Sequence, residues 1–417
     1  MPEREPVLEA TRHQRPASPQ PHAAGHAAAH PATHPGADAT RFDFHRDPFI
    51  VFYELTRACD LACRHCRASA MRKPQPGQLD AASSRRLVEQ LATFDRKPIV
   101  VFTGGDPCKR DDLVDLVQLA NDSGLKPSLA PAATPLLSQA KLDGLKSAGL
   151  QRVAISLDGP DRESHEALRR VPGSFDQSLD AIARCHHAGV GLQINTTVTR
   201  HNLHRLSEMA DAVEASRAGM WSVFFLVPVG RGLREQRIAP EQYEEVFAFL
   251  HEQAGQRPFA IKTTEAPFYR RFVLQRKGDP QRGPARAPLG INDGKGVMFI
   301  AHDGGVQPSG FFDFRCGTFP RDSVVDVYRK HPTFLALRDP DRLAGKCGAC
   351  EFRNVCGGSR ARAFALTGDP LAQEPDCIYQ PKGWKGMGAA TSDDIRMVRE
   401  ASNVHCQTDH PLPTLDA

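Results

Sequence analysis

Short apolar runs alternate with longer amphipathic stretches through most of the chain, and this alternation limits the fold more than any other feature. The runs that predict strands are residues 49–55, 99–103, 126–130, 152–157, 191–198 and 222–227. The stretches that predict helices between them are residues 82–94, 111–122, 137–148, 175–188 and 203–218. Repeated strand-then-helix units favour parallel strands joined by right-handed crossovers, and continuous apolar runs indicate strands covered on both faces. The sequence therefore predicts an α/β fold, either a partial barrel or a flat doubly wound sheet.

The composition argues against several classes of protein. The chain has 417 residues, of which 40% are hydrophobic and 24% charged, as in a soluble globular protein with one large and one smaller domain. A net charge of +4 gives no reason to expect binding to nucleic acid or to a membrane surface. No run approaches the roughly 18 apolar residues of a membrane span, and the first residues lack the pattern of a secretory signal. We therefore expect a cytoplasmic protein.

Changes in composition divide the chain into four parts. Residues 1–42 are rich in Pro, Ala and His and are expected to form a disordered tail. The regular alternation fades after about residue 230, and a segment rich in Gly, Pro and Arg follows. We therefore expect a core domain at residues 43–285 and a smaller domain at residues 286–381. The polar residues 382–417 are expected to form a flexible tail.

A first group of cysteines follows the first predicted strand and reads Cys59-Asp-Leu-Ala-Cys63-Arg-His-Cys66. The chain has 11 cysteines, and an odd number argues against a disulfide framework and favours metal ligands or catalytic groups. Three thiolates can bind three irons of a 4Fe–4S cubane and leave the fourth iron open. A zinc site usually has four ligands, and His65 lies awkwardly between two of these cysteines to be the fourth. A zinc knuckle or incidental cysteines are the alternatives.

This Cys-x3-Cys-x2-Cys spacing after the first strand closely resembles the signature of the radical S-adenosylmethionine (SAM) superfamily. The resemblance implies a partial (β/α)6 TIM-like barrel in which the open iron chelates the amino and carboxylate groups of SAM. An electron from the cluster then splits SAM and leaves a 5′-deoxyadenosyl radical, which abstracts a hydrogen atom from the substrate. The cofactors carry this chemistry, and the protein supplies orientation and excludes water.

The resemblance also implies which residues would contact SAM. Gly104, Gly105 and Asp106 resemble the Gly-Gly-Glu of the superfamily, whose segment contacts the SAM amino group, with Asp in place of Glu. Ser156 and Asn195 match positions that contact the ribose and carboxylate, and Arg169 resembles an arginine that meets the SAM carboxylate. Taken one by one, these residues fit helix caps or solvated faces equally well.

A second group of cysteines, Cys347, Cys350, Cys356 and Cys377, follows a predicted hairpin at residues 296–301 and 305–309. Four thiolates can close a second 4Fe–4S cluster or a structural zinc site, and the spacing alone does not separate the two. The arrangement resembles the C-terminal SPASM/twitch extension of radical SAM enzymes, which favours an auxiliary cluster.

The hairpin has no cysteine near Ser309, where the larger SPASM form carries one, so we expect one auxiliary cluster rather than two. Cys316 is either a further ligand or, as we expect, a buried free thiol. The remaining cysteines, Cys108, Cys185 and Cys406, are expected to be packing or surface residues.

The amino-acid sequence of residues 345–363 is similar to those of the haem-biosynthesis branch of the superfamily. That branch includes the decarboxylase that converts iron-coproporphyrin III propionates to vinyl groups and a protein that trims d-type haem precursors. The leading hypothesis is therefore oxidation of tetrapyrrole propionates. A donor such as ferredoxin or flavodoxin would supply the electron that splits SAM. The auxiliary cluster would accept the electron that the substrate loses. Arg360 and Arg362 would meet the propionates or lie on a solvated helix face. The other hypotheses are a peptide-modifying or enzyme-maturing SPASM protein and a non-enzymatic scaffold stabilised by zinc.

Overall fold

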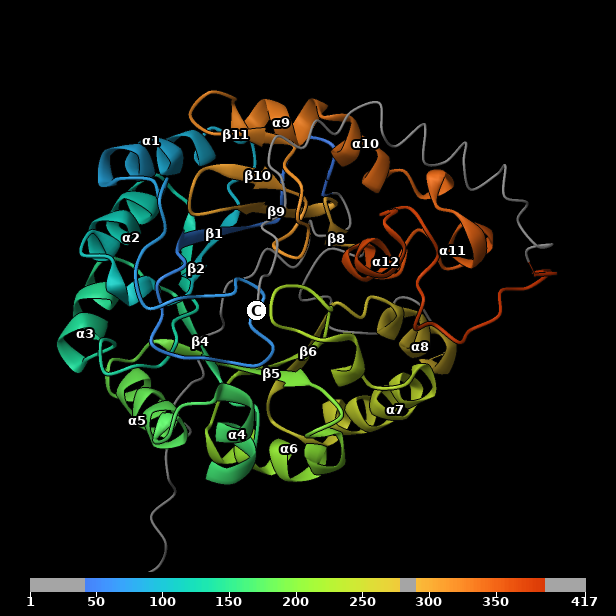
Figure 1. Cartoon of the computed structure of the whole chain (residues 1–417), viewed down its shortest axis with the longest axis horizontal. Helices are drawn as coiled ribbons and strands as arrows, with labels where there is room; N and C mark the ends of the chain where they lie inside the picture. The colour runs from blue at the N-terminus through green and yellow to red at the C-terminus, as the bar shows by residue number, and fades with distance from the viewer. Residues whose placement is uncertain (1–41, 278–289, 387–417) are drawn as a thin grey trace, which may run out of the picture.

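The computed structural model of the protein describes residues 42–277 and 290–386, and one curved sheet runs through it (Figure 1). Seven parallel strands are hydrogen bonded in chain order: β1 (Ile50–Thr56), β2 (Ile99–Gly104), β3 (Lys126–Leu129), β4 (Arg152–Ser156), β5 (Gly191–Val198), β6 (Met220–Phe225) and β7 (Ala260–Thr264). The helices form an outer arc around these strands (Figure 1). The sheet is therefore a partial barrel, because a flat doubly wound sheet would carry helices on both faces.

The outer arc consists of α1 (Ala81–Leu91), α2 (Leu113–Asp122), α3 (Gln139–Ser147), α4 (Arg162–Arg169), α5 (Ser174–His187), α6 (Leu206–Ala215), α7 (Pro240–Gln256) and α8 (Phe268–Lys277). The five predicted helices are present with small shifts at their ends. The expectation that regularity fades after residue 230 is wrong, since β7, α7 and α8 form further regular structure there. The short helix α4 was also missed, because it buries only His165 and Leu168 and is otherwise polar.

The two faces of the barrel strands differ in burial. On β5, Leu192, Ile194 and Val198 are buried beneath the helices, whereas Gln193 and Asn195 are partly exposed. Successive side chains of a strand point to opposite faces, so the polar residues line the inside of the barrel. The prediction that the core strands are covered on both faces is therefore wrong for β5, and the inner face is accessible to solvent.

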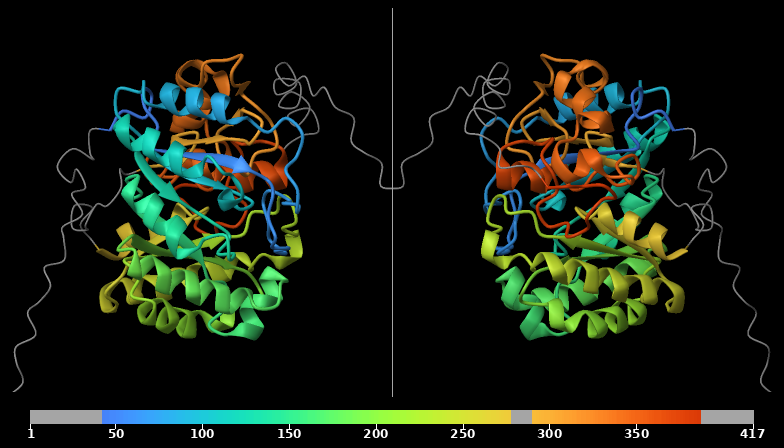
Figure 2. Two further views of the ribbon diagram at one scale, coloured as in Figure 1. Left: turned by 90° about the vertical axis from the view of Figure 1, so that its left-hand side faces the viewer. Right: turned by 90° about the vertical axis from the view of Figure 1, so that its right-hand side faces the viewer.

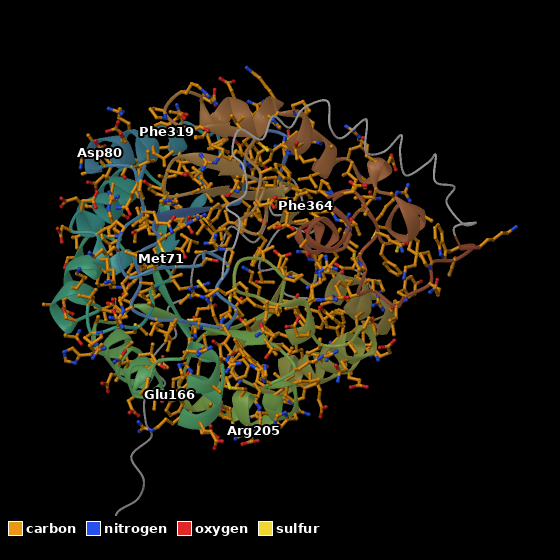
Figure 3. All side chains as sticks on the ribbon, viewed as in Figure 1. Met71, Asp80, Glu166, Arg205, Phe319 and Phe364 are labelled. Atoms are coloured by element: carbon orange, nitrogen blue, oxygen red, sulfur yellow. The ribbon has the colours of Figure 1, made fainter. Side chains whose placement is uncertain are left out.

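Side chains fill the space between the strands and the outer helices (Figure 3), and aromatic rings such as those of Phe225 and Phe247 pack together there. Trp221 of β6 is fully buried, and its ring meets that of Phe259 edge-on with centroids 6.0 Å apart. Its indole nitrogen donates a 2.9 Å hydrogen bond to the hydroxyl of Thr196 on β5. This hydrogen bond spares the fold the cost of a buried donor without a partner.

The C-terminal part of the chain extends the same sheet on the other side of β1. The strand β9 (Gly296–Ile300) pairs in parallel with β1, and β10 (Gly305–Gln307) pairs with β9 in the antiparallel sense, which confirms the predicted hairpin. Figure 2 shows this orange segment beside the blue first strand. The remaining elements are β8 (Asn292–Asp293), β11 (Gly317–Thr318), α9 (Val324–Lys330), α10 (Pro332–Arg338), α11 (Gly345–Ala349) and α12 (Arg360–Thr367).

The predicted domain boundary near residue 285 lies outside the described residues and stays a prediction. The predicted tails also lie outside them, apart from residue 42 and residues 382–386. Among the described helices, none combines the length and the apolar character that a membrane span needs.

Candidate functional site

The loop after β1 brings the first three cysteines together. Cys59 and Cys63 are buried in one small cluster, and Cys66 packs against it. The backbone amide of Leu61 lies 3.4 Å from the sulfur of Cys59, and that of Ala70 lies 3.5 Å from the sulfur of Cys66. Burial raises the pKa of Cys59 to about 12, so the free thiol is protonated and a bound metal would have to displace its proton.

The end of β2 supports this loop by close backbone approach. A Cβ added to Gly105 would lie 2.4 Å from the carbonyl oxygen of Ala58, so only glycine fits. The amides of Gly105 and Asp106 donate 2.7 Å hydrogen bonds to the carbonyls of Thr56 and Ala58. The Asp106 carboxylate is buried and accepts bonds from the Cys108 amide at 3.1 Å and the Thr134 hydroxyl at 2.6 Å. These contacts fix the backbone directly before Cys59, and the predicted contact of Gly104, Gly105 and Asp106 with SAM stays a prediction.

Arg169, at the end of α4, lies beside the same cysteines. Two of its nitrogens lie 2.7 Å from the Asp158 carboxylate, and a third lies 3.7 Å from the sulfur of Cys63. Asp158 is buried and also accepts a 2.8 Å bond from the amide of Thr197. Burial alone would raise the pKa of Asp158, but Arg169, the two neighbouring histidines and the Thr197 amide together lower it more, so the carboxylate is ionised. Asp158 thus holds the Arg169 guanidinium against the cysteine loop.

His65 faces Asp158 rather than the sulfur atoms. Its Nε2 atom lies 3.6 Å from the Asp158 carboxylate, and its buried Nδ1 atom has no partner. Burial lowers the pKa of His65 to about 4, so the ring is neutral. The expectation that His65 is not a fourth ligand stays a prediction.

Ser156 and Asn195 lie on the inner face of the barrel. They are paired across β4 and β5, and both are partly exposed. Asn195 accepts a 2.8 Å hydrogen bond from the side chain of Gln193. The structure therefore places these two predicted residues side by side on the surface that faces the barrel interior.

Sequence reasoning missed the long-range contacts that secure the cysteine loop. The Arg231 guanidinium donates to the carbonyls of Cys63 at 2.9 Å and Ala70 at 2.8 Å. The buried Glu54 carboxylate lies 3.0 Å from Arg67 and 3.3 Å from His302. Burial would raise the pKa of Glu54, but Arg67, the hydrogen bond from His302 and the charge of Arg57 together outweigh it and lower the pKa to about 2. No local pattern signals these contacts, because their partners are far apart in the sequence.

The second cysteine group lines a cavity at the C-terminal end of the described chain. Cys347, Cys350, Cys356 and Cys377 all reach it. The Glu374 amide lies 3.2 Å from the sulfur of Cys347. Backbone amides and cationic side chains stabilise thiolates that are bound to iron. The environment of these four cysteines therefore suits an iron–sulfur cluster.

Among the described residues, no three His, Cys, Asp or Glu side chains are arranged to hold a single metal ion. The donors of both cysteine groups are thiols, which as thiolates bind the irons of a 4Fe–4S cluster.

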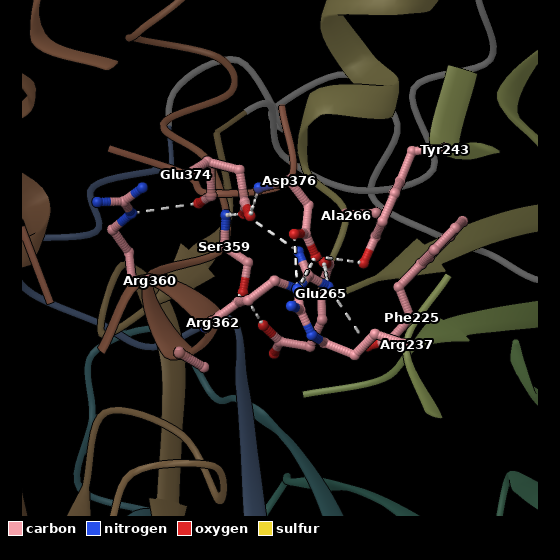
Figure 4. Close-up of polar contacts among 12 residues, drawn as sticks. Phe225, Arg237, Tyr243, Glu265, Ala266, Ser359, Arg360, Arg362, Glu374 and Asp376 are labelled. Atoms are coloured by element: carbon pink, nitrogen blue, oxygen red, sulfur yellow. Dashed lines mark hydrogen bonds and ion pairs between the residues drawn. The ribbon is translucent and has the colours of Figure 1, made fainter. Parts of the chain in front are cut away.

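Arg360 and Arg362 of α12 are buried, so the alternative that they lie on a solvated helix face is wrong. Arg360 donates to the carbonyls of Pro370 at 3.1 Å and Ala372 at 2.6 Å. Arg362 lies between Glu374 at 3.1 Å and Asp376 at 3.3 Å (Figure 4). Their donors are used by the protein itself, so neither is placed to meet a propionate.

The other cysteines lie elsewhere. Cys316 is buried in the main hydrophobic core and does not line the cavity of the second group. Cys108 and Cys185 are also buried in that core, as packing residues are expected to be, and Cys406 lies outside the described residues.

Comparison with known proteins defines the class of this protein. Residues 53–213 match the profile of the Radical SAM superfamily. The chain is 39% identical to the AdoMet-dependent heme synthase of Nitratidesulfovibrio vulgaris over 80% of its own length and 93% of that protein. It belongs to the radical SAM superfamily and is an enzyme, which excludes the hypothesis of a non-enzymatic zinc scaffold. The predicted cofactors, a 4Fe–4S cluster and SAM, are those of the superfamily.

Other relatives locate the chain within the superfamily. The AdoMet-dependent heme synthase of Methanosarcina barkeri is 34% identical over 80% of this chain and 97% of that protein. The PqqA peptide cyclase of Ruegeria pomeroyi is 27% identical over 80% of this chain and 88% of that protein. The crystal structure of Streptococcus suis SuiB bound to its precursor peptide SuiA has a TM-score of 0.61 at 16% identity and covers 80% of this chain and 76% of that one. The last likeness shows the fold alone, and the two heme synthases confirm the predicted resemblance to the haem-biosynthesis branch.

Proposed function

We propose that this enzyme converts a propionate side chain of an iron-containing tetrapyrrole into a vinyl group. The observation that carries the proposal is the 39% identity with an AdoMet-dependent heme synthase over nearly the whole length of that protein. Peptide-modifying relatives match at lower identity.

In this proposal Cys59, Cys63 and Cys66 hold the 4Fe–4S cluster and leave one iron for SAM. Bound there and given an electron, SAM supplies a 5′-deoxyadenosyl radical. Arg169 would pair with the SAM carboxylate, for which its planar guanidinium is well suited.

The other contacts would complete the SAM site. Ser156 and Asn195 would face the ribose from the inner surface of the barrel. Gly104, Gly105 and Asp106 would border the amino group. Asp158 would position Arg169 without touching SAM, since its carboxylate already binds that guanidinium at 2.7 Å.

Loss of a hydrogen atom from the β-carbon leaves a carbon radical on the side chain, and loss of CO2 and one electron from that radical leaves the vinyl group. The electron would pass to an auxiliary cluster held by Cys347, Cys350, Cys356 and Cys377. A ferredoxin or flavodoxin would reduce the SAM cluster, and a reducing cytoplasm would keep the thiols available.

The test uses anoxic protein with its clusters reconstituted, SAM, dithionite and iron-coproporphyrin III. We expect 5′-deoxyadenosine and a product that has lost CO2 and two hydrogens per reacted propionate, measured by mass spectrometry. The Cys63→Ala variant is the control and should form neither product. Protein that cleaves SAM but neither binds nor alters any iron-porphyrin would overturn the proposal and favour a peptide substrate.

A further inference from the structure

Phenylalanine rings form a small apolar cluster of their own where the loop after β10 meets α12. Phe312, Phe314 and Phe364 pack together there, beside Val227 and Val229 of the loop after β6. The ring of Phe364 stacks on that of Phe312 with centroids 5.3 Å apart and meets the ring of Phe314 edge-on at 5.1 Å. These contacts hold the loop and the helix together through aromatic side chains.

Three rings of this cluster reach the surface of the protein. Phe312 is buried, whereas Phe311, Phe314 and Phe364 are each partly exposed. Single apolar side chains on a surface need no explanation, but several gathered in one place mark a contact surface. We call Phe311, Phe314 and Phe364 the phenylalanine surface.

Two segments join the phenylalanine surface to the first cysteine group. Arg67, directly after Cys66, donates a 3.1 Å hydrogen bond to the carbonyl of Gly310, directly before Phe311. The loop after β6 touches the same place, because a Cβ added to Gly230 would lie 2.5 Å from the carbonyl oxygen of Cys66. Figure 1 shows this yellow-green loop between α12 and the blue loop that follows β1. The phenylalanine surface therefore lies close to the predicted SAM site.

This position indicates what would cover the rings. A radical formed from SAM reacts only with a group held against it, at about 3–3.5 Å, so the substrate must lie beside the first cysteine group. The edge of the phenylalanine surface carries both signs of charge. Arg234, which donates a 3.4 Å hydrogen bond to the carbonyl of Ala365, is exposed, and so is Asp313. Charge therefore does not select the ligand, whereas aromatic rings favour a flat apolar body that stacks on them or meets them edge-on.

We propose that Phe311, Phe314 and Phe364 bind the macrocycle of an iron-containing tetrapyrrole. This inference rests on the proposed function and deepens it, because it assigns residues that hold the substrate. The flat macrocycle would lie on the phenylalanine surface while one of its propionates reaches the predicted SAM site. The contact is apolar, so its strength does not depend on the carboxylates of the substrate.

The experiment measures binding of iron-coproporphyrin III to anoxic holoprotein by absorbance titration. We expect Phe364→Ala to bind roughly tenfold more weakly, the loss of one aromatic contact, while Phe364→Tyr, which keeps the ring, binds nearly as wild type does. The matched control is Phe249→Ala, since Phe249 is also partly exposed but lies on α7 in the outer arc. Iron analysis and circular dichroism check that each variant is folded and loaded. If Phe364→Ala does not fold, Phe311→Ala decides the question, and it should also bind more weakly than Phe249→Ala.

The methyl ester of the porphyrin separates contact with the macrocycle from contact with its carboxylates. Because the rings would touch the macrocycle, Phe364→Ala should weaken binding of the ester by about the same factor as binding of the acid. Equal binding of iron-coproporphyrin III by wild type, Phe364→Ala and Phe311→Ala would overturn the inference and leave the proposed function standing. Wild-type protein that binds no iron-porphyrin would overturn both, and would leave the rings to a peptide or to another segment of this chain.

Discussion

Replacement of Arg362 by methionine tests the buried charge network that joins the second cysteine group to the barrel. Arg362 is fully buried, and its guanidinium contacts Glu374 at 3.1 Å, Asp376 at 3.3 Å and the carbonyl of Glu265 at 2.7 Å. Methionine keeps much of the volume but removes the charge and the donors. Removing one partner of a buried pair destabilises a protein by about 3–5 kcal/mol, because the other charge stays buried without compensation.

The remaining contacts set the expected value at the lower end of that range. Asp376 keeps both of its 2.6 Å contacts with Arg237. Glu374 keeps a 2.7 Å bond from the Ser359 amide but loses its only cationic contact in the described network. We therefore expect Arg362→Met to lower the free energy of unfolding by about 3 kcal/mol.

The assay is urea unfolding of anoxic holoprotein followed by circular dichroism, together with iron analysis. The matched control is Arg353→Met, because Arg353 and its partner Asp341 are 36% and 75% exposed and such pairs contribute about 0–1 kcal/mol. The backbone amide of Glu374 also contacts the Cys347 sulfur, so loss of Arg362 should disturb the second cysteine group. The iron content of Arg362→Met should therefore fall by about half, the share of one of two clusters. If Arg362→Met is as stable as Arg353→Met, the reasoning from buried charge is refuted.

Three further substitutions probe the first site. Gly105→Ala should greatly reduce cluster content, since its Cβ would lie 2.4 Å from the Ala58 carbonyl oxygen, and iron analysis checks this. Asp158→Asn should reduce 5′-deoxyadenosine formation at least tenfold by releasing Arg169 (~1.4 kcal/mol per tenfold), whereas an unchanged rate would contradict that positioning role. The folded-state pKa of Glu54 is lowered from 4.5 to about 2, so its stabilisation is present above pH 4.5 and is lost as the pH falls toward 2. Unfolding curves of Glu54→Gln should show a weaker acid dependence in that window, and identical curves would contradict the assigned role of Arg67 and His302.

The sequence predicted those parts of the site that depend on local spacing. Cys59, Cys63 and Cys66 lie within one loop, so their proximity follows from the chain itself. The six strands were recognised because their outward residues are apolar and β-branched. In contrast, β7 was missed because Lys262 and its threonine neighbours lack such a run, and Lys262 is polar because it faces the barrel interior.

Contacts between distant segments could not be predicted in this way. The sequence around Arg360 and Arg362 fits an exposed helix as well as a buried one, because burial depends on Glu374 and on the segment after β7. The sequence shows Asp158 at the end of a strand. It does not show that Asp158 positions Arg169, because that contact forms only when α4 packs against the strand. Whether a charged side chain is buried therefore depends on partners that only the tertiary fold brings together.

The central claim is that Cys59, Cys63 and Cys66 hold a cluster at which SAM is split reductively. The most direct measurement is release of 5′-deoxyadenosine by anoxic protein with a full iron complement, given SAM and dithionite. We predict release by the wild type and none by the Cys63→Ala variant. Wild-type protein that is fully loaded with iron and never releases 5′-deoxyadenosine would contradict the claim.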